Sequence, residues 1–199
     1  QMLSLASETK QVISNAQKPS GLLRIGAIES TCNYVLPEIL EQYMKAWPAV
    51  HISVWTATTL EIMEMLRKNQ VDIILTLDER VSSPTWVTAW EQSNDVLFLC
   101  SPIHPFAGRT DVLLQDVLKE NLLLTEKGCN YRQVFEHDCD LRNLSIQSNL
   151  EIGSIGNILN FTKQNLGITF LPAVVAHKDL AEQTLSVFQI QDYSMLMLI

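Results

Sequence analysis

Small polar residues follow the first predicted strand, at a position where a bound ligand could be held. Glu29, Ser30 and Thr31 come directly after the apolar run 22–28 and precede a stretch with helical spacing. Backbone N–H groups at a helix start carry partial positive charge and favour an anion, and the two hydroxyls could donate further hydrogen bonds. The alternative is that Ser30 or Thr31 only caps the helix. Glu29 would repel an anion, so we expect it either to turn outward or to meet an amino group on the ligand.

Two other helix starts carry residues of the same type. Thr58 and Thr59 precede the second predicted helix, and Gly153 and Ser154 precede a helix in the second half of the chain. Helix capping is again the alternative for the hydroxyls. We expect Gly153 and Ser154 to close the wall opposite the first group.

The segment 125–132 contributes a charge as well as a helix start. Gly128 permits close backbone approach, Cys129 begins the helix, and Arg132 could hold a carboxylate with two hydrogen bonds. The alternative for Arg132 is a surface ion pair with Glu136, which would be worth only about 0.3–0.5 kcal/mol. We favour a binding role, with a small organic acid or an amino acid as the ligand.

Nothing in the sequence indicates catalysis, a cofactor or a metal. Four cysteines stand singly, without a Cys-x-x-Cys pair: Cys32, Cys100, Cys129 and Cys139. This spacing argues against a zinc site. The four histidines are scattered, and neither a Gly-x-Ser-x-Gly elbow nor a phosphate-binding loop occurs. We therefore predict a binding protein and not an enzyme.

The elements that must position these residues alternate between strand and helix. We expect strands at 22–28, 51–55 and 71–77, the last of them central in a parallel sheet. A helix starts near Leu36 and stops at Trp47-Pro48, and another runs over 60–69. In the latter, we expect Leu60, Met63 and Leu66 to point inward. Such alternation is typical of right-handed βαβ units.

The second half of the chain repeats the alternation. Strands are predicted at 85–91, 95–100, 122–125, 146–152, 168–171, 185–190 and 195–199, with helices at 131–139 and 154–164. We therefore predict an α/β fold of two Rossmann-like lobes joined by a two-strand hinge. Open parallel sheets bind ligands at the carboxyl ends of their strands, which would lie in the cleft between the lobes.

The overall composition limits the partners. With 14 basic and 22 acidic side chains the formal charge is −8, which repels phosphate backbones. No apolar run is long enough to span a membrane, and residues 1–20 lack the pattern of a secretory signal. We expect a cytoplasmic protein with reduced thiols. A helix predicted over 1–17 begins without a cap, which suggests a piece of a longer protein.

A series of short motifs resembles one known family. They are Gly-Leu-Leu-Arg-Ile-Gly at 21–26, Val-Leu-Pro-Glu-Ile-Leu at 35–40, Trp-Pro-Ala-Val at 47–50, the entry to a strand at 66–73, His-Pro-Phe-Ala at 104–107 and Gly-Ile-Thr-Phe-Leu-Pro at 167–172. In this order and spacing, over roughly residues 21–190, they resemble the effector-binding domain of LysR-type transcriptional regulators. Asn69 departs from the pattern, because the family often has glycine there.

The resemblance implies a fold like that of type 2 periplasmic binding proteins. Regulatory lobe I would comprise 21–93 and 188–199, regulatory lobe II 94–187, and residues 1–18 would be the end of a linker helix. It also implies a homodimer or tetramer that reaches DNA only through a helix-turn-helix domain absent from this chain, with no membrane partner. The loop 29–31 matches the family's effector-contact position, Thr59 matches a position whose hydroxyl faces the cleft, and the string Gly128-Cys-Asn-Tyr-Arg132 resembles one subgroup.

Two alternative functions remain open from the sequence. Cys129 and Cys139 are spaced much as the redox pair of the family's peroxide sensors, although a helix between them would hold the sulfurs apart. A solute-binding protein of a transporter would share the fold.

Overall fold

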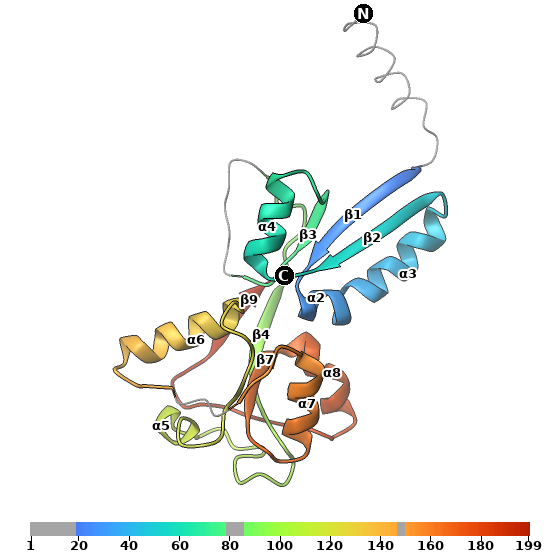
Figure 1. Ribbon diagram of the computed structural model, residues 1–199. Coiled ribbons are helices and arrows are strands. Elements are labelled where there is room, and N and C mark those ends of the chain that lie inside the picture. Colours follow the sequence, from blue (N-terminus) through green and yellow to red (C-terminus); the bar gives the residue numbers. More distant parts are fainter. Residues whose placement is uncertain (1–18, 79–85, 147–149) are drawn as a thin grey trace, which may run out of the picture.

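The computed structural model describes residues 19–78, 86–146 and 150–199. Its elements form two groups that are linked by extended chain (Figure 1). We call the group built from β1 to β3 lobe I, and the group built from α5 to β8 around β4 lobe II. The predicted α/β fold of two lobes is confirmed.

Lobe I is a small parallel sheet with helices beside it. Strand β1 (Gly21–Ala27) lies between β2 (Val50–Thr56) and β3 (Ile73–Leu75) and pairs in parallel with both. The helices are α2 (Glu29–Tyr34), α3 (Leu36–Ala46) and α4 (Thr59–Arg67). Asn69, after α4, has a φ of 54°, so it adopts the left-handed conformation for which the family often uses glycine.

Two expectations for lobe I were wrong. The strand predicted at 71–77 is shorter, and it lies at the edge of the described sheet, because β1 occupies the centre. Its entry is altered by Asp72, whose carboxylate accepts a hydrogen bond from the backbone N–H of Arg24 at 2.9 Å and pairs with the guanidinium at 2.7 Å. Leu60 is 71% exposed, whereas Ile62 is buried. The inward face of α4 is set by Ile62, which packs closely against the site of Gly26 on β1.

Lobe II is organised around one long strand. Strand β4 (Ser93–Cys100) pairs antiparallel with β7 (Thr169–Pro172), β8 (Ser186–Phe188) and β9 (Met195–Leu198). Strand β5 (Leu123–Leu124) pairs in parallel with β6 (Leu150–Glu151). The helices are α5 (Leu114–Val117), α6 (Asn130–Leu141), α7 (Ile155–Lys163) and α8 (Ala173–Ala181).

The main hydrophobic core belongs largely to lobe II. Phe98 on β4 contacts Phe135, Phe170 and Phe188, with ring centroids 5.6, 5.6 and 5.8 Å apart. Aromatic rings at such separations add to the stability that burial alone provides. Leu77, which follows β3, joins this core and thereby connects lobe I to it.

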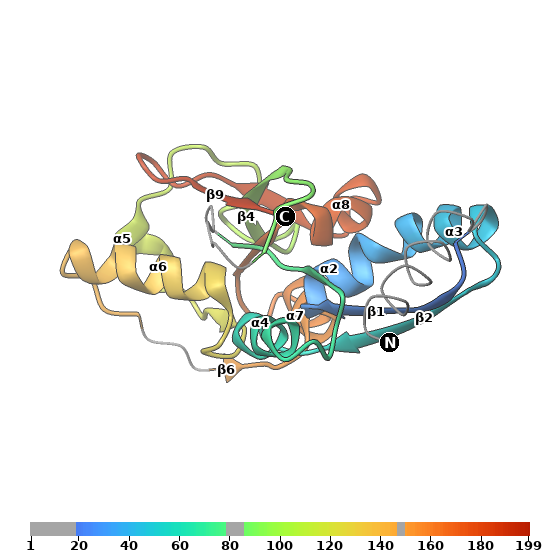
Figure 2. The same cartoon turned by 90° about the horizontal axis from the view of Figure 1, so that it is seen from above.

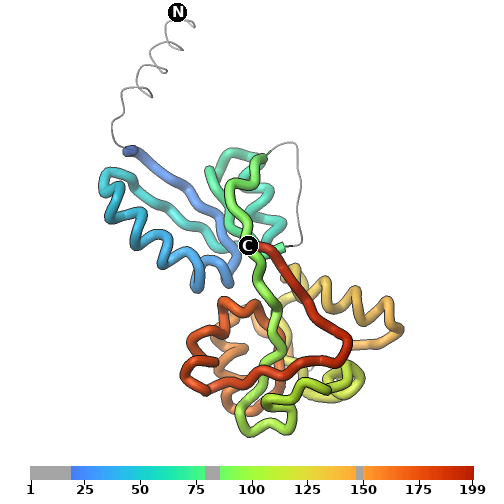
Figure 3. The backbone as a smooth tube through the Cα atoms, turned by 180° about the vertical axis from the view of Figure 1, so that it is seen from behind, coloured from blue at the N-terminus to red at the C-terminus, as the bar shows by residue number. Residues whose placement is uncertain are grey.

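Two antiparallel strands run between the lobes. β4 and β9 pair from Ser93 with Leu198 to Val96 with Met195, and Asp78 forms a further bridge to Leu198. They lie together in the view from behind, as a green and a red segment at the junction of the lobes (Figure 3). Helices α3 and α6 extend toward opposite ends of the molecule (Figure 2).

The remaining differences concern segments with ambiguous patterns. Residues 86–91 form no strand, contrary to prediction, and no strand lies paired with them in the described chain. Helices α5 and α8 were not predicted. The predicted helix at 1–17, residue 85 and residues 147–149 lie outside the described residues.

Candidate functional site

A cavity of about 310 Å³ lies where the two lobes meet. Its walls come from the carboxyl ends of β1 and β2 in lobe I and from the loops before α6 and α7 in lobe II. The residues that line it are Ile28, Glu29, Ser30, Thr56, Ala57, Thr58, Thr59, Glu61, Leu77, Thr125, Glu126, Gly128, Cys129, Asn130, Tyr131, Gly153 and Ile155.

Four helices begin at this cavity. Their first residues are Glu29 of α2, Thr59 of α4, Asn130 of α6 and Ile155 of α7, and all four line it. The first N–H groups of a helix have no partner within the helix, so they are available to side chains or to a ligand. The fold thus gathers hydrogen-bond donors from both lobes in one small space.

Seven of the ten residues predicted for the site line the cavity: Glu29, Ser30, Thr58, Thr59, Gly128, Cys129 and Gly153. The other three, Thr31, Arg132 and Ser154, do not. Thr31 is buried, and its hydroxyl donates to the carbonyl oxygens of Ile28 and Leu75, so it holds α2 against β3.

The Glu29 side chain spans the cleft. Its carboxylate accepts a hydrogen bond from the backbone N–H of Ile155, with N–O distances of 3.1 and 3.2 Å, and lies 3.4 Å from the Ser154 hydroxyl. The Glu29 carboxylate therefore does not turn outward, but caps α7 of the other lobe. Burial raises the pKa of Glu29, the Ile155 hydrogen bond opposes this shift, and Glu126 adds to it.

The threonines at the start of α4, in the same lobe as Glu29, have structural partners of their own. Thr58 caps α4 in a capping box: the Glu61 N–H donates to its hydroxyl, and its own N–H donates to the Glu61 carboxylate. The Thr58 hydroxyl also donates to the Glu61 carboxylate, and the hydrogen bonds from the Thr58 N–H and hydroxyl lower the pKa of Glu61. The Thr59 hydroxyl lies 3.1 Å from that of Thr76. Capping, which the sequence left open for Thr58, is thus observed, and both threonines still border the cavity.

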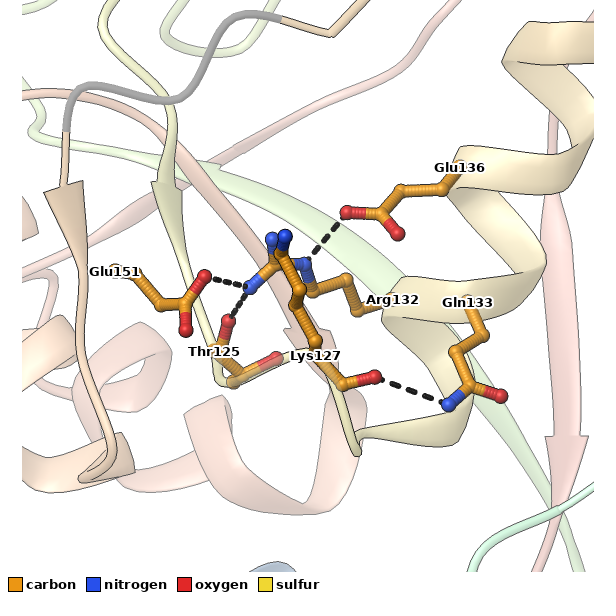
Figure 4. Close-up of polar contacts among 6 residues, drawn as sticks. All are labelled: Thr125, Lys127, Arg132, Gln133, Glu136 and Glu151. Carbon is orange, nitrogen blue, oxygen red and sulfur yellow. Dashed lines mark hydrogen bonds and ion pairs between the residues drawn. The ribbon is translucent and has the colours of Figure 1, made fainter.

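Arg132 is held by the protein (Figure 4). Its side chain is buried, and its guanidinium donates to Glu136 at 2.7 Å, to Glu151 at 2.8 Å and to the carbonyl oxygen of Thr125. The Glu136 pair that we considered as the alternative is present, but it is not a surface contact. By these three bonds Arg132 fixes the loop before α6 to α6 itself and to β6.

In this loop and at the start of α6, the side chains of Thr125, Cys129 and Tyr131 lie close together. The Thr125 residue is 6% exposed, and its hydroxyl makes no hydrogen bond of normal geometry to any described residue. The Cys129 thiol and the Tyr131 hydroxyl lie close enough to it to interact electrostatically. Burial raises the pKa of both Cys129 and Tyr131. The raised pKa values favour the neutral thiol of Cys129 and the neutral hydroxyl of Tyr131.

The cysteine pair does not have the properties of a redox switch. Burial raises the pKa of Cys139 to about 11, and the pKa of Cys129 is raised as well. Reactive cysteines have lowered pKa values. Helix α6 separates the two residues by about 15 Å along its axis, at 1.5 Å per residue. A disulfide would require α6 to unfold.

Ten residues that line the cavity were not among those predicted for the site: Ile28, Thr56, Ala57, Glu61, Leu77, Thr125, Glu126, Asn130, Tyr131 and Ile155. Thr125, Glu126 and Tyr131 lie in the segment that we selected for Gly128 and Arg132, so proximity was the available signal. Leu77 had none, because its apolar character only indicates a core. In the described part of the chain, no three metal-binding side chains are grouped, and no helix has the length and apolarity to cross a bilayer.

Comparison with known proteins decides the family. The model of the LysR substrate binding domain matches residues 16–197. The chain belongs to this family. The LysR domain is 34% identical over 183 residues to the HTH-type transcriptional regulator YwqM of Bacillus subtilis. The aligned region covers 90% of this chain and 61% of YwqM. It therefore spans less than two thirds of that relative.

Solved structures show the same fold. The regulatory domain of CcmR from Synechocystis PCC6803, solved in complex with 2-PG, superimposes with a TM-score of 0.73 at 20% identity, covering 90% of the LysR domain and 86% of that chain. The effector-binding domain of QuiR, in complex with shikimate, superimposes with a TM-score of 0.68 at 15% identity, covering 90% and 87%. The family match identifies an effector-binding domain of a LysR-type regulator.

Proposed function

We propose that this LysR domain binds a small polar metabolite, an organic acid or an amino acid, in the cavity between its lobes. The observation that carries the proposal is the meeting of four helix starts, from both lobes, at one cavity of about 310 Å³. Four lining residues provide hydroxyl groups that can orient a ligand: Ser30, Thr58, Thr59 and Thr125. Related domains have been solved with small molecules, CcmR with 2-PG and QuiR with shikimate.

The ligand would act by changing how the lobes sit together. We infer that lobe I comprises residues 21–93 and 188–199, and that lobe II comprises residues 94–187. Residues 1–18 would be the end of a linker helix. The chain would then cross between the lobes twice, at the start of β4 and at the end of β8, so a small change at these crossings alters the cleft. A ligand that contacts Glu29 and Ile155 would compete with or reinforce the hydrogen bond that joins the lobes.

The response would be read by the whole protein. We propose a cytoplasmic transcriptional regulator whose helix-turn-helix domain, outside this chain, binds DNA as part of a homodimer or tetramer. The charge of −8 is consistent with a domain that does not itself hold DNA. The raised thiol pKa values favour metabolite sensing over the redox alternative.

A ligand screen with a blocked cavity tests this function. A Cβ at Gly128 would lie 3.4 Å from Cγ2 of Thr58, so Gly128→Leu would put a leucine between the lobes. We expect at least one organic acid or amino acid to raise the Tm of the wild-type domain by several degrees. The same compound should not stabilise Gly128→Leu.

Lys178→Leu is the matched control, because it adds a leucine on α8 where the side chain is 83% exposed. It should respond as the wild type does. Equal stabilisation of Gly128→Leu, or no stabilising compound in the screen, would contradict the proposed site.

A further inference from the structure

The charged groups of the cavity all have the same sign. Glu29, Glu61 and Glu126 line it, and the described lining residues include no lysine, arginine or histidine. Arg132 is the cationic side chain that the sequence suggested for the site, but it is already paired with Glu136 and Glu151. An incoming anion would therefore meet three carboxylates without a cationic side chain to balance them.

The helix starts do not reverse this balance. A helix N-terminus corresponds to about half a positive charge, so four of them would fall short of three carboxylates. Two of the four helix starts moreover already interact with a carboxylate of the protein. Glu29 accepts the N–H of Ile155 at the start of α7, and Glu61 caps the start of α4 together with Thr58. The electrostatic environment that remains is negative.

Two lining groups form no hydrogen bond of normal geometry with any residue that the structure describes. No described residue forms a hydrogen bond or ion pair with the carboxylate of Glu126, which is exposed toward the cavity and close enough to Glu29 to raise its pKa. The Thr125 hydroxyl is buried and also makes no normal hydrogen bond within the described chain. Leaving a buried polar group without a hydrogen bond is unfavourable, so a ligand that satisfies it gains affinity. The Glu126 carboxylate can only accept hydrogen bonds, and the Thr125 hydroxyl can accept as well as donate, so a ligand that donates hydrogen bonds suits both.

We propose that the effector carries a protonated amino group, held by the carboxylates of Glu29 and Glu126 and by the Thr125 hydroxyl. This inference rests on the proposed function and narrows the ligand class to amines and amino acids. A cation between Glu29 and Glu126 relieves the repulsion that these two carboxylates exert on each other. A carboxylic acid without an amine would increase it.

An amino acid fits the cavity at both ends. Cys129 is the N-cap of α6, and its side chain accepts no cap hydrogen bond from the first turn. The first N–H groups of α6, at Asn130 and Tyr131, face no carboxylate cap among the described residues. They would receive the carboxylate of an amino acid whose amino group lies at Glu29 and Glu126.

Three probes of equal length but different charge test this inference. The ¹⁵N-labelled domain is titrated with 1,4-diaminobutane, 1,4-butanediol and succinate at about 0.15 M salt, which screens long-range attraction. We expect only diaminobutane to shift the amides of Gly128, Gly153 and Ile155 in a saturable way. Glu126→Gln should weaken this binding about fivefold, the effect of losing one partly exposed ion pair.

Glu126 is exposed, so its substitution leaves the fold intact, and Glu38→Gln on α3 is the control that should bind as the wild type does. Saturable shifts of the same amides by succinate overturn the amine inference but leave the proposed cavity in place. Shifts by diaminobutane that are unchanged in Glu126→Gln and in Glu29→Gln overturn it too, as does the absence of shifts with all three probes. The proposed function itself is tested separately. It fails if a ligand raises the Tm of Gly128→Leu as much as that of the wild type.

Discussion

The carboxylate of Glu29, at the start of α2, accepts a hydrogen bond from the backbone N–H of Ile155, at the start of α7, 126 residues later in the chain. This contact joins the two lobes across the cavity. It places a protein carboxylate where a helix N-terminus would otherwise attract an anionic ligand.

Removal of the Glu29 side chain should weaken α7. Glu29→Ala deletes the cap, whereas Glu29→Gln keeps an oxygen that can accept the Ile155 hydrogen bond. We expect Glu29→Ala to be about 1 kcal/mol less stable than Glu29→Gln, as for the loss of a helix cap. Urea denaturation of the two variants measures the difference, and equal midpoints would show that the contact contributes nothing.

The same residue predicts a pH dependence. The pKa of Glu29 is raised above its ordinary value of 4.5, mainly by burial, so the folded state binds this proton more tightly than the unfolded state. The contribution of Glu29 to stability therefore improves as pH falls through its folded-state pKa toward 4.5. Tyr34, Glu126 and Ser154 face the carboxylate, and none of them supplies a positive charge.

Relative to Glu29→Gln, the wild-type domain should gain stability between pH 7.5 and pH 5. Denaturation curves of both proteins at the two pH values give the comparison. A wild type that loses stability relative to Glu29→Gln over this range would contradict the sign of the shift.

Arg132 should prove to be a structural residue. Its guanidinium bonds to Glu136, Glu151 and Thr125, and its side chain is only 5% exposed. Arg132→Ala should lower the free energy of unfolding by about 2 kcal/mol, in the range for hydrogen bonds to a charged group. Arg109→Ala is the control: it removes an exposed pair with Asp111 and should change stability by less than about 0.5 kcal/mol. Equal effects of the two substitutions would refute this role.

Peroxide should not link Cys129 to Cys139. Both thiols have raised pKa values, that of Cys139 to about 11, and α6 holds them apart. We expect intact-mass analysis after peroxide treatment to show no loss of two hydrogen atoms, and peptide mapping to find no bond between the two. A disulfide formed in the folded domain would restore the redox alternative.

The sequence predicted the fold well where its patterns were regular. The alternation of apolar segments and the motifs around Gly21, Trp47 and Gly167 were sufficient for two α/β lobes. Helix α8 was missed because Ala173-Val-Val-Ala directly continues the apolar strand β7, and short apolar runs do not distinguish strand from helix. Leu60 was misplaced because the inward face of α4 depends on the gap that Gly26 leaves for Ile62.

The candidate site was predicted only in part, because a sequence shows local patterns but not contacts between distant segments. Helix starts are visible in a sequence, so Glu29, Thr59 and Gly128 could be selected. What a side chain bonds to is decided by contacts between distant segments. The sequence could not show that Glu29 reaches Ile155, or that Arg132 is held by Glu151 and is thereby kept from the cavity.

A crystal structure of the domain with its strongest stabilising metabolite tests the central claim most directly. We expect the compound in the cavity between the lobes, within hydrogen-bonding distance of the Thr125 hydroxyl and with an amino group between Glu29 and Glu126. A compound bound elsewhere, for example in the larger groove lined by Trp86, Trp90 and Ile199, would contradict it.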